Sequence, residues 1–244
     1  MSLLPPFLAG EQPVIPDFGE AEECVTENHL FCWGWVEDNW AGVLQPALVE
    51  HVKLTAIAVA AGFAIAFAAA LVAHRTRFFE APFSLVSAIL YTIPSLALFQ
   101  LLVPFTGLSV WTVEIALVGY TLLILFRNIL AGLRAVPDEV LEAALGMGLT
   151  RAQILRRVEL PLALPAIVAG LRIAAVTTVS LATVAAFVIP EGLGHPIFIA
   201  LREYFKTEFI AAGAVAVALA LACDAVLVAA QRLLTPWARG ARAR

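Results

Sequence analysis

Long stretches without a charged side chain dominate this sequence. Residues 54–73 and 81–113 contain no Asp, Glu, Lys or Arg. A helix crosses the hydrocarbon core of a bilayer with about 20 apolar residues. The whole chain is 61% hydrophobic and only 14% charged, whereas a soluble domain is about half apolar and about a quarter charged. Because backbone in lipid must satisfy its own hydrogen bonds, we predict an all-α integral membrane protein.

The apolar runs predict five membrane-spanning helices. They are expected at about 54–73, 82–103, 110–132, 164–189 and 209–233, with a turn at 104–109 between the second and the third. The predicted organisation is an N-terminal segment outside the membrane (1–47), a transmembrane domain (48–236) and a short basic tail (237–244).

Basic residues gather on one side of this arrangement. Arginines follow the first, third and fifth spans, at Arg75, Arg77, Arg134, Arg151, Arg156, Arg157, Arg232, Arg239, Arg242 and Arg244. Cytoplasmic loops of membrane proteins carry an excess of Lys and Arg. We therefore expect a multi-pass protein of the cell membrane, with its N-terminus outside and its C-terminus in the cytoplasm.

A polar segment at 137–161 separates the third and fourth spans. Asp138 follows a proline, and a carboxylate in the first turn favours a helix start. Gly146 and Gly148 end this helix, because glycine adopts the left-handed conformations that helix ends need. A second short helix is expected to begin at a capping box and to end at a proline: Thr150, Gln153 and Pro161. Periodicity alone also allows a loop that lies on the lipid headgroups, with its arginines paired to phosphates.

The order of residues in this segment resembles the EAA loop of importer permeases of the ATP-binding cassette type. The matching positions are Glu142, Ala143, Ala144, Gly148, Leu160 and Pro161. The resemblance implies that they couple the permease to a separate ATPase. The small alanines would let the helix seat closely in a groove of the ATPase, and Gly148 would allow the sharp turn.

The same resemblance implies the partners of the chain. Two cytoplasmic ATP-binding cassette ATPase subunits would dock on residues of about 138–158, and a second permease subunit, of the same or similar sequence, would enclose the path. An extracytoplasmic substrate-binding protein would deliver the solute. The chain would be a transport subunit without enzymatic activity or cofactor, with ATP bound by its partner.

Further segments resemble the osmoprotectant branch of these permeases, which imports glycine betaine, choline or carnitine. They are Tyr91–Leu96, Arg127–Asn128, Gly170–Arg172 and Gly192–Gly194. One segment departs from the pattern of that branch, in which a run of glycines tends to precede the motif found here at Gly192–Gly194. Here the run is Val188-Ile189-Pro190-Glu191, so an importer permease for another small solute, such as an amino acid, stays an alternative.

Two charges lie deep within predicted spans, Arg172 in the fourth and Asp224 in the fifth. An isolated charge in the bilayer is unfavourable, and the two residues are expected at similar depths. We predict that they form an ion pair across these spans. Its role would be a structural clamp or, alternatively, a part of the transport path.

Pro94 interrupts the second predicted span. A proline inside a helix removes a backbone hydrogen bond and kinks the helix. Tyr91, Thr92 and Ser95 lie within one turn of it. These polar groups would either line a transport pathway or hold helices together.

Other polar residues are expected toward the outside. Glu114 and His195 lie near the predicted outer boundary, where solvated side chains are expected. Cys24 and Cys32 either stay free or form a disulfide, if their segment faces an oxidising exterior.

Several site types are absent from the sequence. It contains no glycine-rich phosphate-binding loop, no cluster with metal-ligand spacing and no catalytic constellation. The charge pattern excludes nucleic-acid binding as the main activity, which leaves lipid and protein partners. The rival from a different class is a small membrane enzyme or passive channel with an arginine-rich surface loop.

Overall fold

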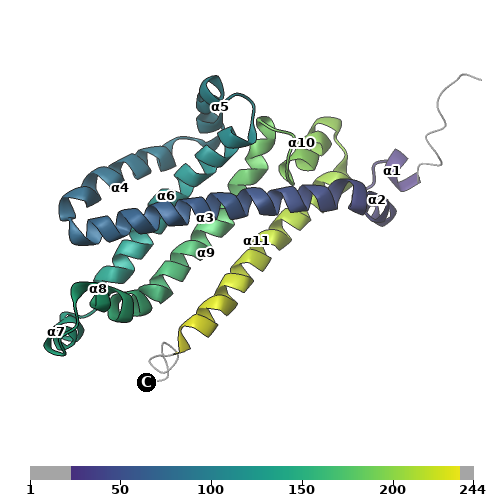
Figure 1. The fold of residues 1–244 in the computed structure, drawn as a ribbon. Helices are drawn as coiled ribbons and strands as arrows, with labels where there is room; N and C mark the ends of the chain where they lie inside the picture. Colours follow the sequence, from purple (N-terminus) through teal and green to yellow (C-terminus); the bar gives the residue numbers. More distant parts are fainter. Residues whose placement is uncertain (1–22, 237–244) are drawn as a thin grey trace, which may run out of the picture.

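Helices are the regular secondary structure throughout residues 23–236, the part of the chain that the computed structural model describes (Figure 1). In this part, four helical runs are long and apolar enough to cross a membrane, or five if a bent helix pair counts as one span: Trp33–Arg75, Val110–Arg134, Arg151–Phe187 and Lys206–Leu234, with the pair Arg77–Thr92 and Ser95–Thr106. The chain is an all-α integral membrane protein. The N-terminal residues 1–22 and the basic tail at 237–244 lie outside the described residues.

Two of these runs contain several elements. The first consists of α2 (Trp33–Asn39), the π-helical turn η1 (Trp40–Leu44) and α3 (Gln45–Arg75). The third consists of α8 (Arg151–Ile154), the π-helical turn η2 (Leu155–Glu159), α9 (Leu160–Val184) and the 3-10 turn η3 (Ala185–Phe187). The other helices are α1 (Glu23–Thr26), α4 (Arg77–Thr92), α5 (Ser95–Thr106), α6 (Val110–Arg134), α7 (Asp138–Gly146), α10 (Gly194–Glu203) and α11 (Lys206–Leu234).

Helix α6 lies at the centre of the bundle. It packs against α3, α4, α5 and α9, while α11 packs on α9 (Figure 1). Helix α7 projects at one end of the bundle, and α10 and α2 lie at the opposite end. We call these the α7 end and the α10 end.

Small residues allow α6 to approach its neighbours closely. A Cβ atom on Gly62 of α3 would lie 1.8 Å from Thr121 Oγ1 of α6, and one on Gly170 of α9 would lie 2.6 Å from Asn128 Cβ. In lipid, such close packing is a main source of helix association, because lipid tails are as apolar as the side chains. The two glycines therefore fix how α3 and α9 pack against α6.

The single helix predicted at 82–103 is wrong. Helices α4 and α5 meet there at an angle of 103°. Pro94 has no backbone N–H and disfavours the helical conformation of the residue before it, so Ile93 is extended (φ −66°, ψ 129°). The Tyr120 hydroxyl of α6 donates a hydrogen bond to the Ile93 carbonyl. The predicted turn at 104–109 is shorter, because α5 continues to Thr106.

The helix end predicted at Pro161 is also wrong. The helix continues from α8 through η2 into α9, and Pro161 lies in the first turn of α9. A proline removes an intrahelical donor, and the π-helical turn just before it widens the backbone so that the helix runs on. The Leu160 N–H accordingly donates to the Leu155 carbonyl, five residues back.

The N-terminal residues 23–44 form a cap at the α10 end, which we call the N-terminal cap. Cys24 and Cys32 form a disulfide in it, with an S–S distance of 2.02 Å. Asn28 Nδ2 donates to the Tyr204 carbonyl (2.8 Å), and the Lys206 N–H donates to Asn28 Oδ1 (3.1 Å). The disulfide-closed loop is thereby attached to the junction of α10 and α11.

This disulfide predicts a specific pattern of thiol labelling. The chain has three cysteines, and Cys223 is the one free thiol in the described residues. Alkylation of the denatured protein should add one label without reductant and three labels after reduction, measured by intact mass. Three labels without reductant would contradict the pairing.

Candidate functional site

The 137–161 segment folds as a helix, a glycine turn and a second helix at the α7 end. Helix α7 begins at Asp138 and ends at Gly146, as predicted. The Met147 N–H donates to the Ala143 carbonyl (3.0 Å), and Gly148 has a φ of +81°. This left-handed conformation favours glycine, since other residues meet a Cβ clash there. The chain reverses direction at this position.

A capping box begins the second helix. Gln153 N donates to Thr150 Oγ1 (3.4 Å), and Thr150 N donates to Gln153 Oε1 (2.8 Å). Two donors that a helix start leaves free are satisfied in this way. The prediction of this capping box is confirmed, and it fixes where the long helix Arg151–Phe187 begins.

The predicted coupling residues do not share one surface. Glu142 and Ala143 are exposed on α7, and Gly148 is exposed in the turn after it. Ala144 is only 2% exposed and packs toward its own chain. Leu160 and Pro161 are half-buried at the start of α9.

Helix α7 exposes apolar side chains beside these residues. Leu145 is 55% exposed and Met147 is 74% exposed. We call the exposed face of this helix and turn the α7 surface, which consists of Val140, Glu142, Ala143, Leu145 and Met147. An apolar surface on a projecting helix is typical of a protein interface.

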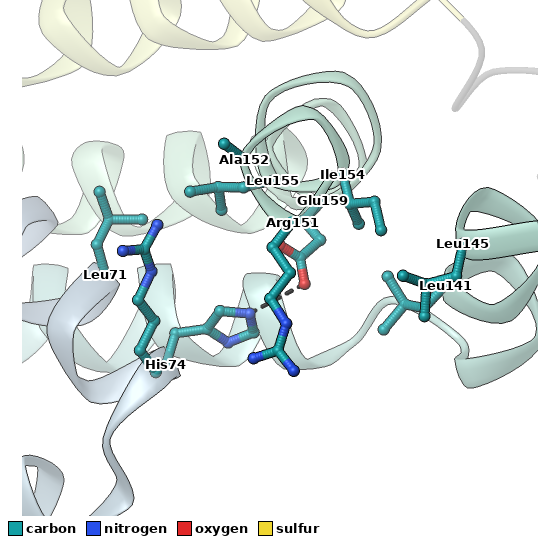
Figure 2. A pocket seen from close by; sticks show the side chains of 10 residues that line it. Leu71, His74, Leu141, Leu145, Arg151, Ala152, Ile154, Leu155 and Glu159 are labelled. Carbon is teal, nitrogen blue, oxygen red and sulfur yellow. Dashed lines mark hydrogen bonds and ion pairs between the residues drawn. The ribbon is translucent and has the colours of Figure 1, made fainter. Parts of the chain in front are cut away.

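A pocket of about 620 Å³ lies between the last turn of α3 and the α7–α8 helix pair (Figure 2). Leucines such as Leu71 and Leu141 form its apolar wall, and Arg75 and Arg151 are among its polar lining residues. His74 Nε2 lies 3.0 Å from Glu159 Oε1 there. This contact, which the sequence analysis missed, connects α3 to η2, directly below the α7–α8 pair.

The structure brings Arg172 and Asp224 together. Arg172 Nε donates to Asp224 Oδ1 (2.7 Å) and Arg172 Nη2 donates to Asp224 Oδ2 (3.0 Å). This fork of two hydrogen bonds is the strong arrangement for an arginine and a carboxylate. It connects α9 to α11, which are also joined by a hydrogen bond from Gln231 Nε2 to the Pro165 carbonyl (3.4 Å).

The residues around Pro94 lie at the sharp α4–α5 corner. Tyr91 is 41% exposed, and its ring packs edge-on to Tyr120 with 6.1 Å between centroids. Thr92 Oγ1 donates to the Ile89 carbonyl (2.9 Å), and Ser95 begins α5. Two of these groups are therefore engaged in holding the corner.

Comparison with known proteins settles the family. Residues 52–240 match the family described as binding-protein-dependent transport system inner membrane component. The chain belongs to this family. The choline transport system permease protein OpuBB of Bacillus subtilis (strain 168) is 38% identical over 196 residues, which cover 80% of this chain and 90% of that protein.

Further relatives agree with this permease assignment. The glycine betaine/carnitine/choline transport system permease protein OpuCB of the same organism is 35% identical over 188 residues, 77% of this chain and 86% of that protein. An inward-facing structure of the MetNI methionine ABC transporter has a TM-score of 0.67 at 22% identity, covering 83% of this chain and 97% of that chain. The resemblance drawn from the EAA loop is confirmed, and this chain is the permease component of a transport system.

The sequence led us to expect a solvated side chain at Glu114 of this permease, and this prediction is wrong. It is 6% exposed, and neither carboxylate oxygen has a hydrogen-bond partner in residues 23–236. The reason is its place on α6, the helix that the others surround. No local signal in the sequence marks that place.

His51 is a second buried polar residue of the permease that the sequence analysis missed. Its Nδ1 accepts a hydrogen bond from the Leu193 N–H (3.2 Å), so its Nε2 carries the proton and donates to the Val179 carbonyl (3.0 Å). The adjacent Glu50 accepts a hydrogen bond from the Gly192 N–H (2.9 Å). These two residues of α3 hold the segment between η3 and α10.

Proposed function

We propose that this permease is the membrane subunit of an ATP-driven importer for quaternary ammonium osmoprotectants, such as glycine betaine or choline. The proposal rests on one observation above all, the similarity over 80% of the chain to a permease named for choline transport. The solved structure at 22% identity supports the fold alone.

The α7 surface is the proposed docking site for the ATPase subunits. It projects from the α7 end, and it presents apolar side chains beside Glu142 and Ala143. Most arginines of the described residues lie in the elements at this end (Figure 1), with Arg202 of α10 as an exception, and this excess supports a cytoplasmic orientation. The α10 end, with the N-terminal cap, would then face an external substrate-binding protein, and a second permease subunit would complete the path.

The long helix Arg151–Phe187 is proposed to transmit the displacement of α7 by the ATPase to the membrane-spanning helices. It begins at the capping box next to α7 and crosses the bundle as one continuous run. The His74–Glu159 contact attaches α3 to its base. A displacement of α7 by the ATPase would therefore move α9 and α3 together.

Adjacent alanines on α7 offer a matched test of the docking site. Ala143→Leu adds bulk to the exposed surface, so we expect it to reduce co-purification of the ATPase by about tenfold or more without lowering thermal stability. Ala144→Leu overpacks a buried position, so we expect it to lower stability. ATPase recovered at an equal amount with Ala143→Leu would contradict the docking site.

Competition uptake tests the proposed solute. Vesicles that contain the assembled transporter should accumulate labelled choline or glycine betaine in an ATP-dependent way, and excess unlabelled methionine should not compete. Competition by methionine instead would favour an amino-acid importer. Solute accumulation without ATP would favour a passive channel.

A further inference from the structure

A second pocket, of about 350 Å³, lies at the α10 end. It is bounded by η1, the first turns of α3, α10 and α11, and the segment before α10. Two carboxylates line it, Glu50 from α3 and Glu208 from α11, with His195 from α10. The rest of the wall is largely apolar and includes Pro46 and Pro190.

Glu208 is the unusual residue of this pocket. Its residue exposure is 8%, and no hydrogen bond or ion pair reaches its carboxylate from the described residues. The nearby Glu203 adds like-charge repulsion. The carboxylate of this mostly buried residue opens to the pocket, and a cation bound there would supply the partner that the described side chains do not.

Glu50 also has a carboxylate oxygen that could bind a cation. Its Oε2 accepts the Gly192 N–H at 2.9 Å, and its other oxygen, Oε1, has no partner within residues 23–236. The pocket therefore presents two carboxylates from different helices, α3 and α11. One of them is held in place by a backbone hydrogen bond.

Two basic side chains of α10 and α11 make other contacts. The Arg202 guanidinium lies over the Phe198 ring, 5.4 Å from its centroid, and Lys206 Nζ donates to the Asn28 carbonyl (3.1 Å). No Lys or Arg lines the pocket within the described part of the chain. Lys53 lies three residues after Glu50 on α3 and is exposed outside the pocket, so among the lining residues only His195 can oppose the two carboxylates.

The wall of the pocket indicates the class of cation. Three prolines and the aliphatic side chains of Val43, Ala47 and Ile199 offer apolar contact. No group of three His, Cys, Asp or Glu side chains able to hold a metal ion occurs among residues 23–236. An organic cation with methyl groups fits two carboxylates and apolar walls better than a metal ion does.

We propose that this pocket is a binding site for the ammonium group of small organic cations, with Glu208 and Glu50 as its charged residues. That the bound cation is also the transported solute rests on the proposed function. The site would favour choline over glycine betaine, because the carboxylate of the zwitterion would approach two like charges.

Equilibrium binding tests the site apart from transport. Labelled choline is bound to the transporter, purified with the subunits that accompany it and held in lipid nanodiscs without the external binding protein. We expect saturable binding that tetramethylammonium displaces. The uncharged isostere of choline, 3,3-dimethylbutan-1-ol, should displace it at least about tenfold less well, because it lacks the charge.

Two variants with the same change of charge locate the site. Glu208→Gln should weaken choline binding by about tenfold or more, whereas Glu203→Gln, at an exposed position on α10 outside the pocket, should change it by no more than about twofold. Glu208→Asp keeps the charge and should bind choline better than Glu208→Gln. Co-purification of the ATPase subunits in the wild-type amount shows that the variants are assembled.

Each result decides between the proposals. Absence of saturable choline binding, equal displacement by the uncharged isostere, or equal choline binding by the Gln variants at 203 and 208 overturns the cation site. If Glu208→Gln does not assemble, the displacement of choline from the wild-type transporter still tests whether the site selects a charged ammonium group. Choline binding that depends on Glu208, in a transporter that takes up no quaternary ammonium compound, would reject the proposed function and retain the site.

Discussion

Replacing Gly148 with aspartate is expected to abolish ATP-driven uptake and to leave membrane insertion intact. Gly148 has a φ of +81°, and no neighbouring heavy atom lies within 4 Å of the place of a Cβ atom. The effect of a side chain therefore comes from the backbone, where the left-handed conformation costs an L-residue about 1–2 kcal/mol. A relaxed turn would point α7 away from its docking position.

Uptake and ATP hydrolysis measured in the same vesicles check this result, and we expect uptake to fall by about tenfold or more. Gly146→Asp is the matched control, because it adds the same side chain to the same loop where φ is not positive and space is open. Gly148→Asn adds a side chain of nearly the same size without the charge, and both Asn and Asp tolerate the left-handed region better than other L-residues. A smaller loss of uptake with Asn would therefore assign the difference to the charge placed in the turn. Normal uptake in Gly148→Asp would remove the coupling role of this turn.

Reversing the charge of Asp224 is expected to have the second large effect. Asp224→Arg places a second guanidinium against Arg172 within the membrane, where an unpaired charge is strongly disfavoured. Both hydrogen bonds of the present fork, at 2.7 Å and 3.0 Å, are lost. We expect the amount of protein in the membrane and its uptake to fall by about tenfold.

Exchanging the two charges tests whether the ion pair itself, and not either residue alone, stabilises the protein. Arg172→Asp combined with Asp224→Arg restores opposite charges, so we expect it to recover much of the protein level. Protein level is measured by quantitative blotting of membranes, and uptake is measured on the same samples. A double variant as poor as either single reversal would show that the contact between these two side chains is not what stabilises the α9–α11 packing.

The loop at the α7 end was predicted well because its signals are local. Asp138 begins α7, Gly148 turns the chain, and Thr150 with Gln153 begins α8, each through bonds to residues a few positions away. Such short-range chemistry can be read from a single sequence. The exposure of Ala143 and the burial of Ala144 depend on how α7 lies against α8, which local signals do not determine.

The errors concern positions that depend on the surrounding helices. Pro94 predicted a kink, but the bend there is 103°, and Tyr120 of α6, distant in the sequence, donates a hydrogen bond to the Ile93 carbonyl at this corner. Pro161 looks like a helix end until the π-helical turn before it is known. Glu114 looks like a boundary residue, and only the packing around α6 buries it.

Two histidines of α3 have a mechanical consequence for this permease. His51 is bonded to the Val179 carbonyl and His74 to Glu159, so α3 is fastened at two levels to the same helical run. The fastenings are separated by about 35 Å of helix, at about 1.5 Å per residue. Helices joined in this way pivot together and do not slide past each other. We therefore expect a push at Arg151 to swing the opposite tip of the pair, near Gly192, in the reverse direction.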